Sequence, residues 1–128
     1  MKNIKKYIFF ILLLQSVSLI AQKERFKNYS VNEGLPQSDV LDAVQDHIGY
    51  IWFATQGGGI AKFDGAYFET YNQNNGLISN YVNTFFLKKD TLLIGTNKGL
   101  SKKINHVFTN FKTPKIHKII KLNEHIYL

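Results

Sequence analysis

The chain has 128 residues, a formal net charge of +7 and no cysteine. Its 45% hydrophobic content, with only two prolines, excludes a wholly disordered chain, and its length indicates one small domain. The charge does not indicate nucleic-acid binding: three of the 16 basic residues stand in the first 21 positions, and the other 13 are scattered among nine acidic residues. Ten phenylalanines and seven tyrosines favour strands over helices.

The first segment, residues 1–21, has the three-part layout of a secretory signal peptide. A basic start precedes the apolar stretch Tyr7–Leu14, and the small residue Ala21 marks the cleavage site. Polar residues from Gln15 onward keep the apolar stretch below the ~20 residues that span a bilayer, although an uncleaved anchor is the alternative. We expect export to a bacterial periplasm or cell surface. The absence of cysteine suits this location, because the exported chain then folds without disulfides.

Residues 22–33 form a lead-in segment. The part of the chain after it contains four short apolar stretches. They predict strands at Val40–Gln45, Tyr50–Ala54, Gly59–Phe63 and Ala66–Tyr71. Glycine and aspartate stand between them, above all in Asp46-His47-Ile48-Gly49 and Asp64-Gly65, and these residue pairs suit hairpin turns.

The same pattern then recurs with a period of about 40 residues, which is typical of propellers and solenoids. The first copy spans 34–73, the second spans 74–113, and residues 114–128 begin a third. Ile51-Trp52-Phe53-Ala54-Thr55 matches Leu92-Leu93-Ile94-Gly95-Thr96, and Gly59-Ile60 matches Gly99-Leu100. Both faces of the strand around Trp52 are apolar, so both must be covered, as in a propeller blade between two neighbours.

The sequence therefore predicts an all-β fold of β-propeller blades, each with four antiparallel strands. The ring is incomplete at about two and a half blades, since closure needs about four to eight. We expect further blades from a remainder of the chain or from another copy. Trp52, inside an apolar strand, is expected to pack between blades rather than to stack on a ligand.

The repeated motifs resemble the two-component regulator propeller repeat. The resemblance is strong in the first copy and weaker in the second, which lacks the tryptophan and the Asp-x-x-Gly turn. The residues that match the repeat pattern are Gly34, Leu35, Asp46, Gly49, Trp52, Thr55, Gly59, Gly76, Leu77, Gly95, Thr96 and Gly99.

The resemblance implies the N-terminal periplasmic sensor part of a hybrid two-component sensor histidine kinase of the Bacteroidetes type, and with it a small glycan product as ligand. The kinase modules of such sensors are absent from these 128 residues, so this chain is not expected to be an enzyme. It would meet a membrane only through the signal peptide or a span further downstream. The alternative is a secreted propeller scaffold or a carbohydrate-active protein without a signalling role.

The residues that lead into the innermost strands are the predicted ligand site, because they lie near the central funnel of a propeller. They are Ser38, Asp39, Ser79 and Asn80. No metal or cofactor is expected. The four histidines lack metal-ligand spacing, the Gly57–Gly59 run lacks the Lys-Ser/Thr of a phosphate loop, and the aspartates near position 42 lack the pattern of a calcium loop.

Overall fold

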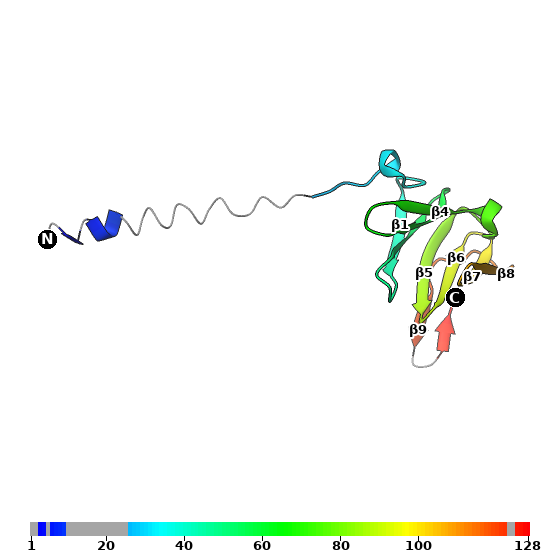
Figure 1. The fold of residues 1–128 in the computed structure, drawn as a ribbon. Coiled ribbons are helices and arrows are strands. Elements are labelled where there is room, and N and C mark those ends of the chain that lie inside the picture. Colours follow the sequence, from blue (N-terminus) through cyan, green and yellow to red (C-terminus); the bar gives the residue numbers. More distant parts are fainter. Residues whose placement is uncertain (1–2, 5, 10–25, 123–124) are drawn as a thin grey trace.

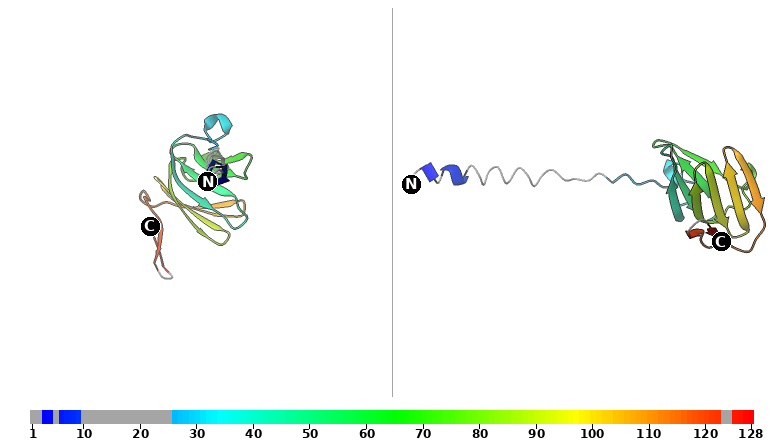
Figure 2. Two further views of the ribbon diagram at one scale, coloured as in Figure 1. Left: turned by 90° about the vertical axis from the view of Figure 1, so that its left-hand side faces the viewer. Right: turned by 90° about the horizontal axis from the view of Figure 1, so that it is seen from below.

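The computed structural model describes residues 3–4, 6–9, 26–122 and 125–128 (Figure 1). The predicted signal peptide, residues 1–21, therefore lies for the most part outside the described residues. Two four-stranded antiparallel sheets and one hairpin account for the strands, and Figure 2 gives two further views of them. In the described part of the chain, no helix is long and apolar enough to cross a membrane.

The first sheet, blade 1, has the order β1-β2-β3-β4, and the second, blade 2, has the order β5-β6-β7-β8. Blade 1 contains β1 (Val40–Gln45), β2 (Ile51–Thr55), β3 (Gly59–Phe63) and β4 (Phe68–Tyr71). Blade 2 contains β5 (Val82–Lys88), β6 (Thr91–Thr96), β7 (Gly99–Ile104) and β8 (Val107–Phe111), and a hairpin of β9 (Ile120–Leu122) and β10 (His125–Tyr127) follows.

The predicted four-stranded antiparallel blades are confirmed. The one clear difference is β4, which begins at Phe68 and not at Ala66. The Asp64 carboxylate accepts hydrogen bonds from the backbone amides of Ala66 and Tyr67 at 2.8 and 2.7 Å. These bonds hold both residues in the turn, because the aspartate takes the amides that a longer strand would need.

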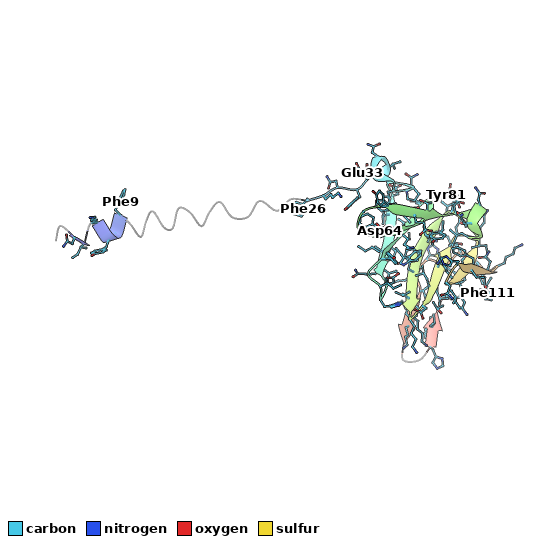
Figure 3. The ribbon with its side chains drawn as sticks, in the orientation of Figure 1. Phe9, Phe26, Glu33, Asp64, Tyr81 and Phe111 are labelled. Carbon is cyan, nitrogen blue, oxygen red and sulfur yellow. The ribbon has the colours of Figure 1, made fainter. Side chains whose placement is uncertain are left out.

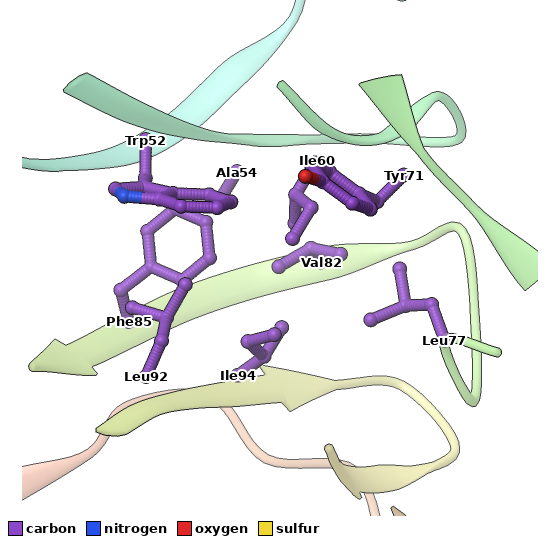
Figure 4. Packing of buried hydrophobic residues seen from close by; sticks show 9 residues of the cluster. All are labelled: Trp52, Ala54, Ile60, Tyr71, Leu77, Val82, Phe85, Leu92 and Ile94. Atoms are coloured by element: carbon purple, nitrogen blue, oxygen red, sulfur yellow. The ribbon is translucent and has the colours of Figure 1, made fainter. Parts of the chain in front are cut away.

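The core lies between the two blades (Figure 4). Ile60, Val82 and Ile94 have no exposed surface there, and the Phe85 side chain of blade 2 reaches toward the Trp52 indole of blade 1. Trp52 belongs to this cluster and is 6% exposed. It therefore packs between the blades, as its place in an apolar strand predicts. The blades are therefore joined mainly by apolar burial.

A polar link joins the innermost strands of the two blades. A bulge between Val40 and Asp42 interrupts the register of β1, and such bulges re-aim side chains. One carboxylate oxygen of Asp42 accepts hydrogen bonds from the Phe85 amide at 2.8 Å and from the Thr84 hydroxyl at 3.1 Å. These hydrogen bonds thus fix the position of β5 relative to β1.

We expect Asp42→Ala to lower the free energy of unfolding by about 1–3 kcal/mol, because the Phe85 amide would lose its acceptor. Urea denaturation followed by circular dichroism measures the change. Asp39→Ala, at an exposed residue three positions earlier, is the control and should stay within about 0.5 kcal/mol of the unsubstituted chain. Equal effects of the two substitutions would contradict the role given to Asp42.

The turn that leads into each blade is built twice in the same way. A short 3-10 turn, η2 (Val31–Glu33), is capped by Ser30 and ends at Gly34, whose φ is 106°. Its counterpart, η3 (Gln73–Asn75), is capped by Asn72 and ends at Gly76, whose φ is 100°. Figure 3 labels Glu33 on the first of these turns.

The residue before each cap is a tyrosine that packs on the following blade. Tyr29 lies with its ring centroid 4.8 Å from Phe63 and 5.7 Å from Phe68 of blade 1. Tyr71, in the same place before η3, lies 5.9 Å from Phe108 of blade 2. The repeat in space therefore begins upstream of the first strand.

Candidate functional site

The loops at one end of the blades hold the four residues predicted to bind a ligand. Ser38 and Asp39 are exposed just before β1, Asn80 is half-buried, and Ser79 is 1% exposed. The Ser79 hydroxyl donates to the Asn97 side-chain oxygen at 2.6 Å and accepts from the Tyr81 amide at 3.1 Å. The Ser79 hydroxyl is thus engaged in holding the loop.

The β2–β3 turn lies between the two halves of this predicted site. The Asp39 carbonyl accepts from the Gln56 amide at 3.0 Å, and the Asn80 carbonyl accepts from the amides of Gly57 and Gly59 at 3.1 and 2.9 Å. The structure therefore ties Asp39 and Asn80 to one turn. That these four residues bind a ligand stays a prediction.

A larger cavity opens at the opposite end, between blade 1 and blade 2. It has a volume of about 580 Å³, within the range of small-molecule sites. We call it the interblade cleft. Its rim comes from the β1–β2, β5–β6 and β7–β8 turns, and its lining includes Tyr50, Trp52, Lys62, Tyr71, Leu92 and Lys103.

The wall from blade 1 is aromatic. The rings of Trp52 and Tyr71 lie 5.8 Å apart between centroids, and the Trp52 indole N–H donates to the Asp46 carboxylate at 2.9 Å. The other oxygen of Asp46 accepts from three backbone amides of its own turn at 3.0–3.1 Å. Asp46 thereby fixes both the hairpin and the indole plane.

Two lysines, one from each blade, line the cleft. The Lys62 ammonium of blade 1 lies 2.8 Å from the Glu69 carboxylate and 4.5 Å from the centroid of the Tyr50 ring. The Lys103 side chain of blade 2 is only 7% exposed. Its ammonium lies 5.0, 5.2 and 5.9 Å from the ring centroids of Trp52, Tyr71 and Phe108, and it donates to the Asn105 carbonyl.

These surroundings shift the pKa values of the cleft groups. Burial lowers the pKa of Lys103, the Lys62 charge lowers it further, and the carboxylates of Glu69 and Asp46 oppose both effects. Burial and a hydrogen bond with Glu69 raise the pKa of the Tyr71 phenol, which therefore stays neutral. The hydrogen bond from Lys62 is the main cause that lowers the pKa of Glu69.

At the mouth of the cleft, His47 of blade 1 lies 3.5 Å from the Asp90 carboxylate of blade 2, and both side chains are exposed. Across the described residues there is no group of three or more His, Cys, Asp or Glu side chains that could hold a metal ion. The mouth thus offers an imidazole and a carboxylate as polar groups.

Acid should loosen the hairpin that holds the indole. Burial raises the pKa of Asp46, but the hydrogen bonds from Trp52 and three backbone amides outweigh it and hold the pKa below its ordinary value of 3.8. A carboxyl with a depressed folded pKa stabilises the protein above its unfolded pKa, and this contribution disappears as the pH falls through the folded value. We therefore expect the stability contributed by Asp46 to be lost as the pH falls below about 3.8.

Urea denaturation at a series of pH values measures this loss. Asp46→Asn should be less stable than the unsubstituted chain at neutral pH and should lose less on acidification. Parallel stability curves for the two proteins would contradict the role of the Asp46 carboxylate.

Sequence reasoning identified Asp46 and Trp52 as repeat positions but missed the cleft and its two lysines. A signal for Lys103 was present: when the copies are aligned on Gly59 and Gly99, Lys103 matches Phe63 in an otherwise apolar position. Lys62 carries no comparable signal, since a lysine, Lys102, stands at its place in the second copy.

Comparisons with known proteins add to this geometry. A protein of Formosa agariphila named histidine kinase P4 is 38% identical over 76 residues, which is 58% of this chain and 6% of that protein. The crystal structure of the extracellular domain of a putative hybrid two-component system from B. thetaiotaomicron matches with a TM-score of 0.62 and 25% identity, over 72% of this chain and 14% of that chain. The chain is similar to the sensor region of two-component systems.

The resemblance predicted from the repeats is thereby confirmed, although no family model matches the chain. The chain spans only a small share of the length of either relative, so the activities of those whole proteins are not carried over to it. The part of the solved relative that matches is an extracellular domain and not a kinase domain.

Proposed function

We propose that this chain is the exported, ligand-sensing β-propeller part of a two-component signal-transduction sensor, and that it senses a glycan product. One observation carries the proposal: the two blades match an extracellular sensor domain and, at the same time, enclose the interblade cleft. No catalytic step is proposed for the chain itself.

The chemistry of the cleft supports a sugar as ligand. Its walls combine aromatic rings, which cover the apolar face of a sugar ring, with polar groups at the mouth that can bond to hydroxyls. The half-buried Tyr50 ring offers such a face beside the buried rings of Trp52 and Tyr71, and His47, Asp90 and Asn105 supply the polar rim. The loop site around Asp39 offers backbone and side-chain polar groups, and its residues are not among those that line the interblade cleft.

Binding is tested with the full chain and a panel of neutral and acidic mono- and disaccharides. Trp52 is the only tryptophan in the sequence and lines the cleft, so its fluorescence reports occupancy of the cleft. A ligand should change the emission saturably and should bind more weakly to Tyr50→Ala. Asp39→Ala, at the other end of the blades, is the matched control; a loss of binding in this variant alone would place the ligand at the predicted loop site.

Signalling is tested in the host cell. An in-frame deletion of codons 26–122 should abolish the transcriptional response to the glycan that binds, and osmotic shock should release the chain or expose it to protease from outside. A normal transcriptional response together with altered glycan breakdown would instead favour the secreted scaffold or carbohydrate-active alternative.

A further inference from the structure

We propose that the interblade cleft binds a small ligand carrying a carboxylate beside an apolar ring face, and that the Lys103 ammonium receives the carboxylate. This inference rests on the proposed function, since it names the class of ligand that the sensor would take. It comes from a difference between two places that the repeat makes equivalent.

The two places lie on the third strand of each blade, β3 and β7. Each pairs with a phenylalanine of the fourth, outer strand. Phe63 pairs with Phe68 in blade 1, and Lys103 pairs with Phe108 in blade 2. In blade 1 the position is a plain aromatic cluster, in which Phe63 lies 4.8 Å from Tyr29 and 4.6 Å from Phe68. In blade 2 the same aromatic surroundings enclose a cation.

A phenylalanine at position 103 would satisfy these surroundings, as blade 1 shows. Burying an ammonium there costs free energy that only a partner of opposite charge fully offsets. Aromatic faces and the Asn105 carbonyl stabilise the charge in part. A residue that breaks the local rule of its own repeat is expected where function requires it.

The carboxylates nearby are committed elsewhere. Glu69 pairs with Lys62, and Asp46 accepts from the Trp52 indole and three amides. Neither of the ion pairs found among residues 26–122 and 125–128 includes Lys103. Lys103 therefore stands in the cleft as a cation with no carboxylate of the described residues at ion-pair distance.

The lining and volume of the cleft indicate the size and the apolar character of the rest of the ligand. Lys103 lines the same cavity as Trp52, Tyr71 and Leu92, so a carboxylate that reaches its ammonium brings its neighbouring atoms against these apolar side chains. A volume of about 580 Å³ admits one or two rings. The class is thus a ring with a carboxylate attached, whether an acidic sugar or another cyclic organic acid.

Three probes separate these features: glucuronate, glucose and cyclohexanecarboxylate, each titrated into the full chain with Trp52 emission as the readout. We expect saturable binding of glucuronate and, at equal concentration, none of glucose, which lacks the carboxylate. Binding of cyclohexanecarboxylate as tight as that of glucuronate would show that the site recognises the acid without the sugar hydroxyls, and would identify a cyclic organic acid as the source.

The variants test the lysine. Lys103→Phe restores the residue of blade 1, so it should fold and should weaken glucuronate binding about tenfold or more. Lys103→Met, which keeps an unbranched side chain without the charge, is the second variant in case the larger ring does not fit. Lys102→Phe removes the same charge from a neighbouring residue that does not line the cleft, and should leave binding unchanged.

Unchanged glucuronate affinity in both Lys103 variants would overturn the inference, as would the absence of binding by both carboxylates. Tight binding of glucose or another neutral sugar that survives Lys103→Phe would overturn it while leaving the proposed glycan sensor intact. Binding of cyclohexanecarboxylate alone, lost in Lys103→Phe, would support the lysine site and reject the glycan part of the proposed function.

Discussion

Trp52→Ala should lower the free energy of unfolding by about 3–5 kcal/mol, most of the stability of an ordinary small domain. The indole is 6% exposed and packs between the blades against Tyr71 and Phe85 (Figure 4). Its removal leaves a cavity that a sheet on each side cannot close, because both sheets are held by their own hydrogen-bond ladders. The substitution also leaves Asp46 without its side-chain donor.

Urea denaturation followed by far-ultraviolet circular dichroism measures this effect, since the variant has no tryptophan emission. Trp52→Phe is the matched variant: it keeps most of the ring contact and loses the indole N–H, so about 1–2 kcal/mol should be lost. If alanine cost no more than phenylalanine, the indole would contribute mainly its hydrogen bond, and the account of Trp52 as the central packing residue would be wrong.

Gly59→Ala should lower the free energy of unfolding by about 3 kcal/mol or more, for two separate reasons. Gly59 has a φ of +86°, a backbone conformation that alanine adopts only under strain. A Cβ at this position would also collide with the Tyr71 carbonyl oxygen at the end of β4. Relieving that collision would part β3 from β4 and disturb the bond from the Gly59 amide to Asn80.

Gly65→Ala separates the two reasons. Gly65 has a φ of +102°, and nothing lies within 4 Å of the Cβ that alanine would add. Only backbone strain applies there, and we expect a loss of about 1–2 kcal/mol. Chemical denaturation of both variants gives the difference; similar losses would mean that the backbone of β4 yields easily at Tyr71.

The strands and turns of blade 1 were predictable because they depend on short-range chemistry. Apolar runs of four to six residues fix the strands, and the aspartates at 46 and 64 accept bonds from their own turns, as their spacing from glycine indicates. The start of β4 was wrong by two residues because the extent of the Asp64 bonds depends on the turn geometry and not on residue type alone.

The cleft was not predictable in the same way. It exists because β7 of blade 2 brings Lys103 against Trp52 of blade 1, and which faces of two sheets meet is set by the packing of the blades. The loop residues were proposed as a ligand site because they precede inner strands, a position that can be read along the chain, and that proposal stays a prediction. Their bonds to the turn at Gln56–Gly59 again depend on the contact between distant segments.

Tyr29 and the capped turn after it show that the chain enters blade 1 as it later passes from blade 1 to blade 2. The unit that is repeated in the sequence therefore does not coincide with one sheet. It begins at the position of an outer strand, continues through the capped turn, and ends with the first three strands of the next blade. In the sequence register of the repeat, residues 26–29 match β4, although they form no strand themselves. A shortened chain that began at β1 would remove the Tyr29 ring that packs on Phe63 and Phe68, so a folded module has to begin ahead of Tyr29 to keep these contacts.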